Sequence, residues 1–173
     1  LFGVIATIVI VAVIPKVQGD KPIPFIKQLA LLKNPKVLLG LFITLFWLSG
    51  YALVYIYIAP YLLKGLGLSG VLLSPALLVF GVACLVGSKV GGYCADKYGI
   101  TSTLLVSMCL NIISLIFLSL SAHHPIIIFV FLFLWSASVW STQPAQLYNL
   151  ATIVPSQSGI MLSLNQSISQ ISM

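Results

Sequence analysis

The sequence has very few charged residues: it contains no Arg and no Glu, and its only acidic residues are Asp20 and Asp96. Charged residues make up 6% of the 173 residues, whereas about a quarter of a typical soluble domain is charged. A water-soluble fold needs polar groups over its surface, so this composition excludes an ordinary soluble domain. Because lipid removes that need, a chain with 60% apolar residues is predicted to be a membrane protein.

Sequence motifs typical of metal, redox, catalytic or ATP-binding sites are also missing. The three cysteines, Cys84, Cys94 and Cys109, lie far apart without C-x-x-C spacing, so neither a zinc site nor a redox site is predicted. The motifs H-E-x-x-H, G-x-S-x-G and Walker A do not occur, so these residues give no support to an enzyme or an ATP-driven pump. No cofactor or metal is expected. The net charge of +6 does not indicate nucleic-acid binding, because the lysines lie in short connectors between apolar runs.

Long apolar runs predict the membrane-spanning segments, since about 20 residues of helix cross the hydrocarbon layer. Four runs have this length: residues 37–61, 71–91, 101–121 and 126–148. Every backbone amide in lipid must find a partner within the protein, so the runs are expected to be helices. The chain is expected to be cut inside two further helices, one ending near residue 14 and one beginning at residue 159.

Lysines are concentrated in alternate connectors. Seven of the eight lie in the connectors 15–36, 89–100 and 149–158, and only Lys64 lies in 62–70 or 122–125. The positive-inside bias therefore places the first set of connectors in the cytoplasm.

The connector from Gly92 to Gly99 carries the most specific pattern. Asp96 is expected just before the next helix, where the helix dipole favours a carboxylate, and Lys97 can pair with it or with phospholipid. Gly92, Asp96, Lys97 and Gly99 resemble the cytoplasmic loop motif of the major facilitator superfamily, Gly-x-x-x-Asp-(Arg/Lys)-x-Gly-(Arg/Lys). Ile100 and Thr101 depart from this motif. The motif has two interpretations: a helix cap with a cytoplasmic lysine, or, by the resemblance, a contact with the other half of a transporter.

The resemblance implies an all-α membrane fold, the C-terminal bundle of a twelve-helix major facilitator truncated at both ends. Residues 1–14 would end the sixth helix, 15–36 would form the central cytoplasmic loop, and 37–173 would contain helices seven to eleven. The stretch from Gln143 to Asn165 resembles the drug:proton antiporter and sugar-efflux branch. The implied function is export of a small molecule in exchange for protons, by alternating access in the cell membrane.

The implied partners are a small-molecule substrate, protons, the lipid bilayer and the N-terminal half of the same transporter. No Asp, Glu, Lys or Arg lies within a spanning core, so the proton site is expected outside this segment. Two alternatives stay open: a membrane-embedded enzyme, and a non-transporting scaffold or sensor.

Polar and aromatic side chains at membrane depth are the candidate substrate contacts. They are Tyr51, Tyr55, Ser136, Trp140, Gln143, Asn165 and Gln166. The alternative role for these side chains is hydrogen bonding between helices.

Two stripes of small residues recur at a spacing of four. They are Ala83, Gly87 and Gly91 in one span, and Ala137, Ser141 and Ala145 in another. Small residues at this spacing let two helix backbones approach closely in lipid, so both stripes are predicted to be helix-packing faces.

Overall fold

The computed structural model describes residues 31–122 and 124–173, and all regular structure in this part is helical. Its long helices are α3 (Pro35–Pro60), α4 (Gly70–Tyr98), α5 (Ile100–Leu120), α6 (Pro125–Ile153) and α7 (Ser158–Ser172). Short helical turns are η1 (Leu31–Lys33), η2 (Tyr61–Gly65) and η3 (Pro155–Gln157). The predicted helix end at 1–14, and most of the predicted loop 15–36, lie outside the described residues.

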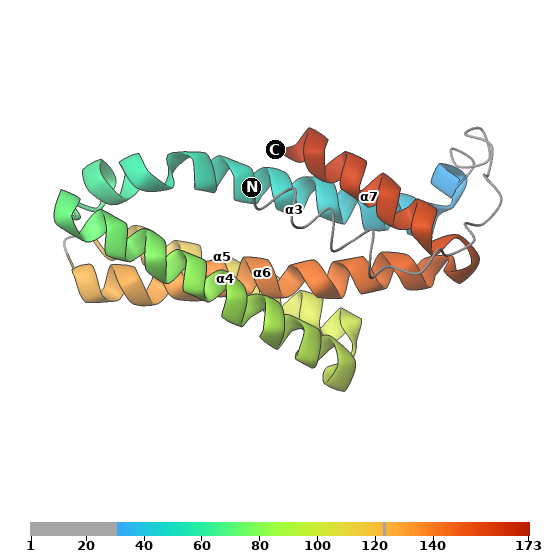
Figure 1. Cartoon of the computed structure of the whole chain (residues 1–173). Coiled ribbons are helices and arrows are strands. Elements are labelled where there is room, and N and C mark those ends of the chain that lie inside the picture. The colour runs from blue at the N-terminus through green and yellow to red at the C-terminus, as the bar shows by residue number, and fades with distance from the viewer. Residues whose placement is uncertain (1–30, 123) are drawn as a thin grey trace, which may run out of the picture.

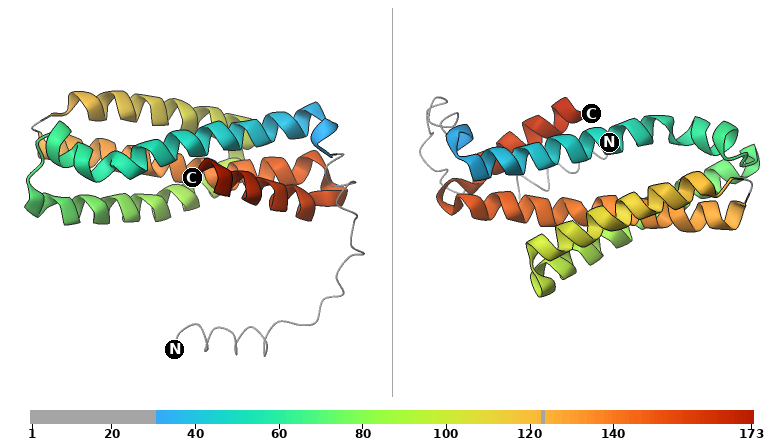
Figure 2. Two further views of the ribbon diagram at one scale, coloured as in Figure 1. Left: turned by 90° about the horizontal axis from the view of Figure 1, so that it is seen from above. Right: turned by 180° about the vertical axis from the view of Figure 1, so that it is seen from behind.

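Four helical segments are long and apolar enough to cross a membrane, as predicted from the apolar runs. They are Pro35–Gly65, which joins α3 to η2, and the whole of α4, α5 and α6, with mean hydropathies of 1.8 to 2.3. The helices run alternately up and down, and α6 lies between the α4–α5 pair and the α3–α7 pair (Figures 1 and 2). The all-α membrane fold is therefore confirmed.

Glycine brings the backbones of α4 and α6 together. A Cβ atom added to Gly87 would overlap the carbonyl oxygen of Ala137, and one added to Gly91 would overlap that of Ser141. Only glycine fits at these two positions, because any larger residue would push the backbones apart. The predicted helix-packing role is thus confirmed at Gly87 and Gly91, which pack against Ala137 and Ser141 of the other stripe.

Serine hydroxyls join α5 to the same part of α6. Ser107 and Ser141 share a hydrogen bond of 2.8 Å, and Ser141 also donates to the carbonyl of Ser138 at 2.8 Å. Both side chains are buried, so their polar atoms are satisfied inside the protein, as hydrocarbon requires.

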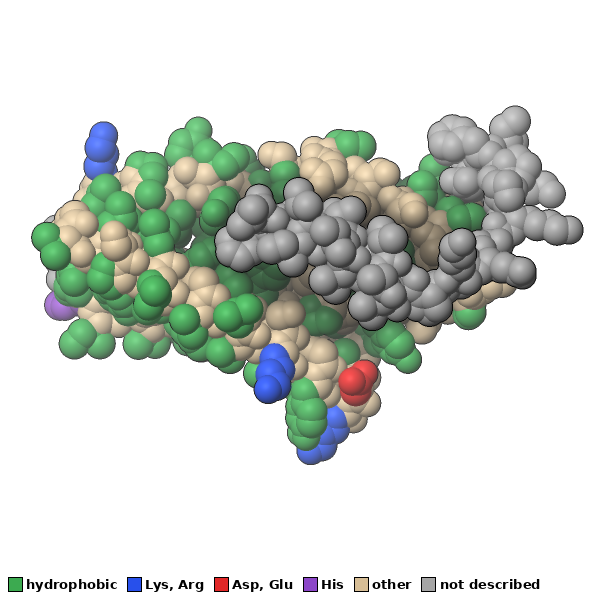
Figure 3. Space-filling view, viewed as in Figure 1, with side chains coloured by type: hydrophobic (Ala, Val, Ile, Leu, Met, Phe, Trp, Pro, Cys, Tyr) green, Lys and Arg blue, Asp and Glu red, His purple; other side chains and the backbone are tan. Residues whose placement is uncertain are grey.

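The outer surface of the bundle is largely apolar. Figure 3 shows hydrophobic side chains gathered over the left part of the visible face, with a few lysine and acidic side chains at the upper left and at the bottom. Large side chains such as Leu78 and Leu85 on α4 and Ile126 on α6 are more than two-thirds exposed. In water this would be a costly surface, but against lipid tails it is the expected one.

The connector predicted from Gly92 to Gly99 is wrong in its extent. Helix α4 continues through Tyr98, and Gly99 alone, with a φ of 87°, turns the chain into α5. The polar residues after Gly91 therefore lie on the last two turns of a helix. The break in the apolar pattern after Gly91 predicts a loop, but polar side chains on a helix end can reach water without unwinding the helix.

Replacing Gly87 by alanine tests the α4–α6 contact, and Gly81→Ala on the same helix is the matched control. Both changes raise helix propensity equally, but a Cβ at Gly81 has no neighbour within 4 Å, whereas one at Gly87 meets the backbone of Ala137. We expect Gly87→Ala to destabilise the full-length protein by about 1–3 kcal/mol, and Gly81→Ala to leave it unchanged or slightly more stable. Thermal unfolding in detergent measures this, and equal Tm values for the two variants would contradict the packing role.

Candidate functional site

A small hollow between α3, α6 and α7 is lined by aromatic and polar side chains from all three helices. Its volume is about 110 Å³. Four of the seven predicted contacts line it: Tyr51, Trp140, Gln143 and Gln166. Further lining comes from Trp47, Leu48, Val139, Ser169, Gln170 and Met173. The sequence-based candidates from three different spans are thus brought to one place.

One wall of the hollow is aromatic. The Tyr51 ring stacks on Trp135 at 6.0 Å between centroids and meets Trp140 edge-on at 6.4 Å. Tyr55, another predicted contact, stacks on Tyr51 at 5.4 Å and lies 5.6 Å from Phe80 of α4. Tyr55 is about half exposed and belongs to the same aromatic cluster without lining the hollow. These rings present flat apolar faces, which suit stacking against a ring or an aliphatic face of a ligand.

The N–H groups of two indoles that line the hollow donate no hydrogen bond to any described residue. The Nε1 atoms of Trp47 and Trp140 are buried, and neither has a hydrogen-bond partner among the described residues. A buried donor without a partner costs free energy, so it favours any state in which an acceptor reaches it. With the amides of Gln143, Gln166 and Gln170, the hollow therefore offers hydrogen bonds to a ligand but no charged group.

Ser136 does not face the hollow. Its hydroxyl donates to the carbonyl of Phe80 at 2.9 Å and lies 3.2 Å from the Sγ atom of Cys84, both in α4. The side chain is fully buried, so the structure places Ser136 in the contact between α4 and α6.

Asn165 also points away from the hollow, into a buried polar network that the sequence analysis did not identify. Its Oδ1 accepts a 2.8 Å hydrogen bond from Thr44 of α3. Gln146 of α6 donates to Thr44 at 3.1 Å and to the carbonyl of Gly40 at 2.7 Å. The signal that could have found Gln146 was an amide within an apolar run, since such a group must be paired in lipid.

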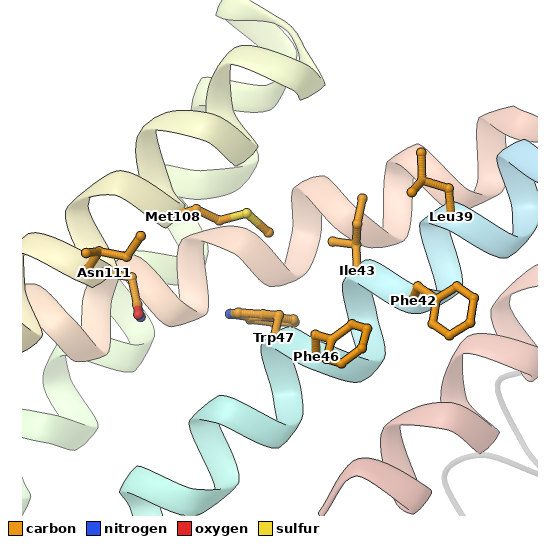
Figure 4. A pocket seen from close by; sticks show the side chains of 8 residues that line it. Leu39, Phe42, Ile43, Phe46, Trp47, Met108 and Asn111 are labelled. Carbon is orange, nitrogen blue, oxygen red and sulfur yellow. The ribbon is translucent and has the colours of Figure 1, made fainter.

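A second, larger hollow lies between α3 and α5 and has a volume of about 830 Å³ (Figure 4). Its lining is Leu39, Phe42, Ile43, Phe46 and Trp47 of α3 with Met108, Asn111 and Ile112 of α5. Asn111 is its one polar side chain other than the indole of Trp47. Because it is open and almost wholly apolar, it has little with which to orient a ligand, and we do not assign it as the site.

The loop motif has a geometry that differs from the expectation. Asp96 lies in the last turn of α4 and does not cap α5, whose first residues follow Gly99 without a side-chain cap. Lys97 donates to the Tyr93 hydroxyl at 3.1 Å and lies over the Tyr93 and Tyr98 rings at 5.5 and 5.4 Å. Adjacent residues on a helix point in different directions, so Lys97 is held by the tyrosines and Asp96 stays exposed.

Comparison with known proteins agrees with this architecture. The chain is 53% identical over 173 residues to the uncharacterized MFS-type transporter YbcL of Bacillus subtilis, a match that covers all of this chain and 44% of that protein. It is 23% identical over 163 residues to the inner membrane transport protein YdhP of Escherichia coli, which covers 94% of this chain and 42% of that protein. The chain thus spans less than half the length of these relatives. No solved structure gives a significant match.

The family comparison extends over the whole sequence. Residues 1–173 match the sequence profile of the Major Facilitator Superfamily. This agrees with the resemblance seen in Gly92, Asp96, Lys97 and Gly99, and with a bundle of apolar helices long enough to cross the bilayer. The chain therefore belongs to the Major Facilitator Superfamily of membrane transporters.

Proposed function

We propose that the whole protein is a secondary active transporter that exports a small, largely uncharged solute, a drug or a sugar, in exchange for protons. The observation that carries this proposal is the hollow between α3, α6 and α7, where indole, phenol and amide groups from three helices converge. Membership of a transporter superfamily favours this reading over an embedded enzyme or a scaffold.

The described hollow supplies only part of a substrate site. Ligand sites usually measure about 300–1,000 Å³, and the hollow measures about 110 Å³. We propose that the N-terminal half of the same transporter supplies the opposite wall, with residues 37–173 as the C-terminal half and 15–36 as the central loop. Alternating access then follows from the two halves rocking about the site.

The proton carrier is assigned to that other half. None of the residues that line the hollow is Asp, Glu, His, Lys or Arg. A proton-coupled transporter needs a titratable group that faces each side of the membrane in turn. Tyr51, Trp140, Gln143 and Gln166 are therefore proposed as substrate contacts only, through stacking and hydrogen bonds.

The motif at the end of α4 is proposed to contact the other half on the cytoplasmic side. The exposed carboxylate of Asp96 and the tyrosine-held ammonium of Lys97 are displayed next to the tight turn at Gly99. Opposite charges side by side at a fixed turn suit a polar docking contact between the two halves.

The direct test is transport by the full-length protein in liposomes with an imposed proton gradient. We expect at least one solute from a panel of amphipathic drugs and sugars to move only when the gradient is present. Trp140→Phe keeps the aromatic ring but removes the indole donor, so we expect a rise in KM of roughly fivefold, equivalent to about 1 kcal/mol. Correct insertion without movement of any solute would contradict the proposal.

Thiol labelling tests which candidates face the cavity. In a full-length background with Cys84, Cys94 and Cys109 replaced by serine, we expect Gln143→Cys and Gln166→Cys to react with a water-soluble thiol reagent. Ser136→Cys is the control and should react much more slowly, because its side chain is buried between α4 and α6. Fast labelling at position 136, or none at 143 and 166, would place the cavity elsewhere.

The same background tests the orientation in the membrane. A membrane-impermeant thiol reagent added to intact cells should modify Lys64→Cys, in the turn η2, and should not modify Lys97→Cys until the cells are opened. The reverse pattern would invert the topology.

A further inference from the structure

The network of Thr44, Gln146 and Asn165 joins three helices through one chain of hydrogen bonds. Gln146 of α6 donates to Thr44 of α3 at 3.1 Å, and Thr44 donates to Asn165 of α7 at 2.8 Å. Gln146 also donates to the carbonyl of Gly40 at 2.7 Å and accepts from Asn149 at 3.4 Å. The three side chains are no more than 3% exposed, so these bonds form away from water.

The hydrogen-bond distances favour one direction along the network. A threonine hydroxyl has a single proton, and Thr44 already accepts from the amide of Gln146. Its proton can be donated to Asn165 Oδ1 at 2.8 Å or to the carbonyl of Gly40 at 3.4 Å, and the shorter distance favours Asn165. Thr44 is the central member, since it is the one side chain bonded to both other helices.

Asn165 makes a contact that differs from those of the α7 serines. Serine hydroxyls of α7 donate hydrogen bonds to backbone carbonyls of α7 itself; these serines are Ser163, Ser167, Ser169 and Ser172. Among the described residues, the bond to Thr44 is thus the one side-chain hydrogen bond that ties α7 to another helix. Around it, Leu41, Leu150 and Met161 pack as a small apolar cluster, whose contacts are less directional than a hydrogen bond.

The network lies directly beside the hollow. Thr44 is one turn from Trp47 and Leu48, and Gln146 is one turn from Gln143. On α7, Asn165 is adjacent in sequence to Gln166 and one turn from Ser169, and both of these line the hollow. A rotation or slide of α7 would therefore displace these side chains from the space that they line.

We propose that Thr44, Gln146 and Asn165 are positioning residues that set the rotation and height of α7, and thereby where Gln166 and Gln170 stand in the hollow. For substrate affinity this rests on the function proposed above. For the placement of α7 it does not. The three residues touch no substrate themselves, because they are enclosed by the helices that they join.

The test uses two substitutions of Thr44 that differ in one group. Thr44→Val keeps the shape but loses the hydroxyl, and Thr44→Ser keeps the hydroxyl. In the full-length, cysteine-replaced protein with Gln166→Cys as reporter, we expect Thr44→Val to change the thiol-modification rate by roughly threefold, the change one interhelical hydrogen bond supports. Thr44→Ser should restore the rate, and a reporter at Lys64, exposed in the turn η2, should not respond.

Two further variants keep the result decisive. If Thr44→Val fails to insert, Asn165→Ala removes the acceptor on α7 alone and should give the same change at position 166. When both are made together, the change should not exceed that of either alone. An unchanged rate in both single variants, or additive effects in the double variant, would overturn the positioning role. Because labelling needs no transport, this outcome is separate from failure of the transport assay, in which Thr44→Val should raise KM more than it lowers kcat.

Discussion

The close approach of α4 to α6 is the constraint on which the rest of the described bundle depends. In lipid no hydrophobic effect holds two helices together, so backbone contact and hydrogen bonds must do so. Gly87 and Gly91 permit that contact, and Ser107 bonds α5 to the serine of α6 that Gly91 touches. Helices α4, α5 and α6 consequently form one packed unit.

Helix α3 meets this unit in two chemically different ways along its length. In its second half, Tyr51 stacks on Trp135 of α6, and Tyr55 packs against the tilted ring of Phe80 of α4. In its first half, Thr44 takes part in directional hydrogen bonds that tolerate little movement. The hollow lies between the two regions, so hydrogen bonds bound one end of it and aromatic rings bound the other.

Much of the fold could be predicted from the sequence, because length and apolarity alone determine which runs cross a bilayer. The packing stripes were also predictable, because small residues four apart in a membrane helix, such as Gly87 and Gly91, indicate close contact with another helix. The end of α4 was not, because the polarity of Asp96 and Lys97 indicates contact with water and does not distinguish a loop from a helix end. Sequence placed Ser136 and Asn165 at membrane depth, but which neighbour each hydroxyl or amide meets depends on helix rotation. That quantity is set by packing between spans and has no local pattern.

The single residue between α4 and α5 has a mechanical consequence. Two peptide units extend over about 7 Å at most, so the Cα atoms of Tyr98 and Ile100 cannot move further apart than this. A displacement of the end of α4 therefore also displaces the start of α5. Both helices contact α6, α4 through its glycines and α5 through a serine. A displacement at Asp96 or Lys97 would thus be transmitted to α6 through both helices, and the α4–α5 pair would move as one rigid body.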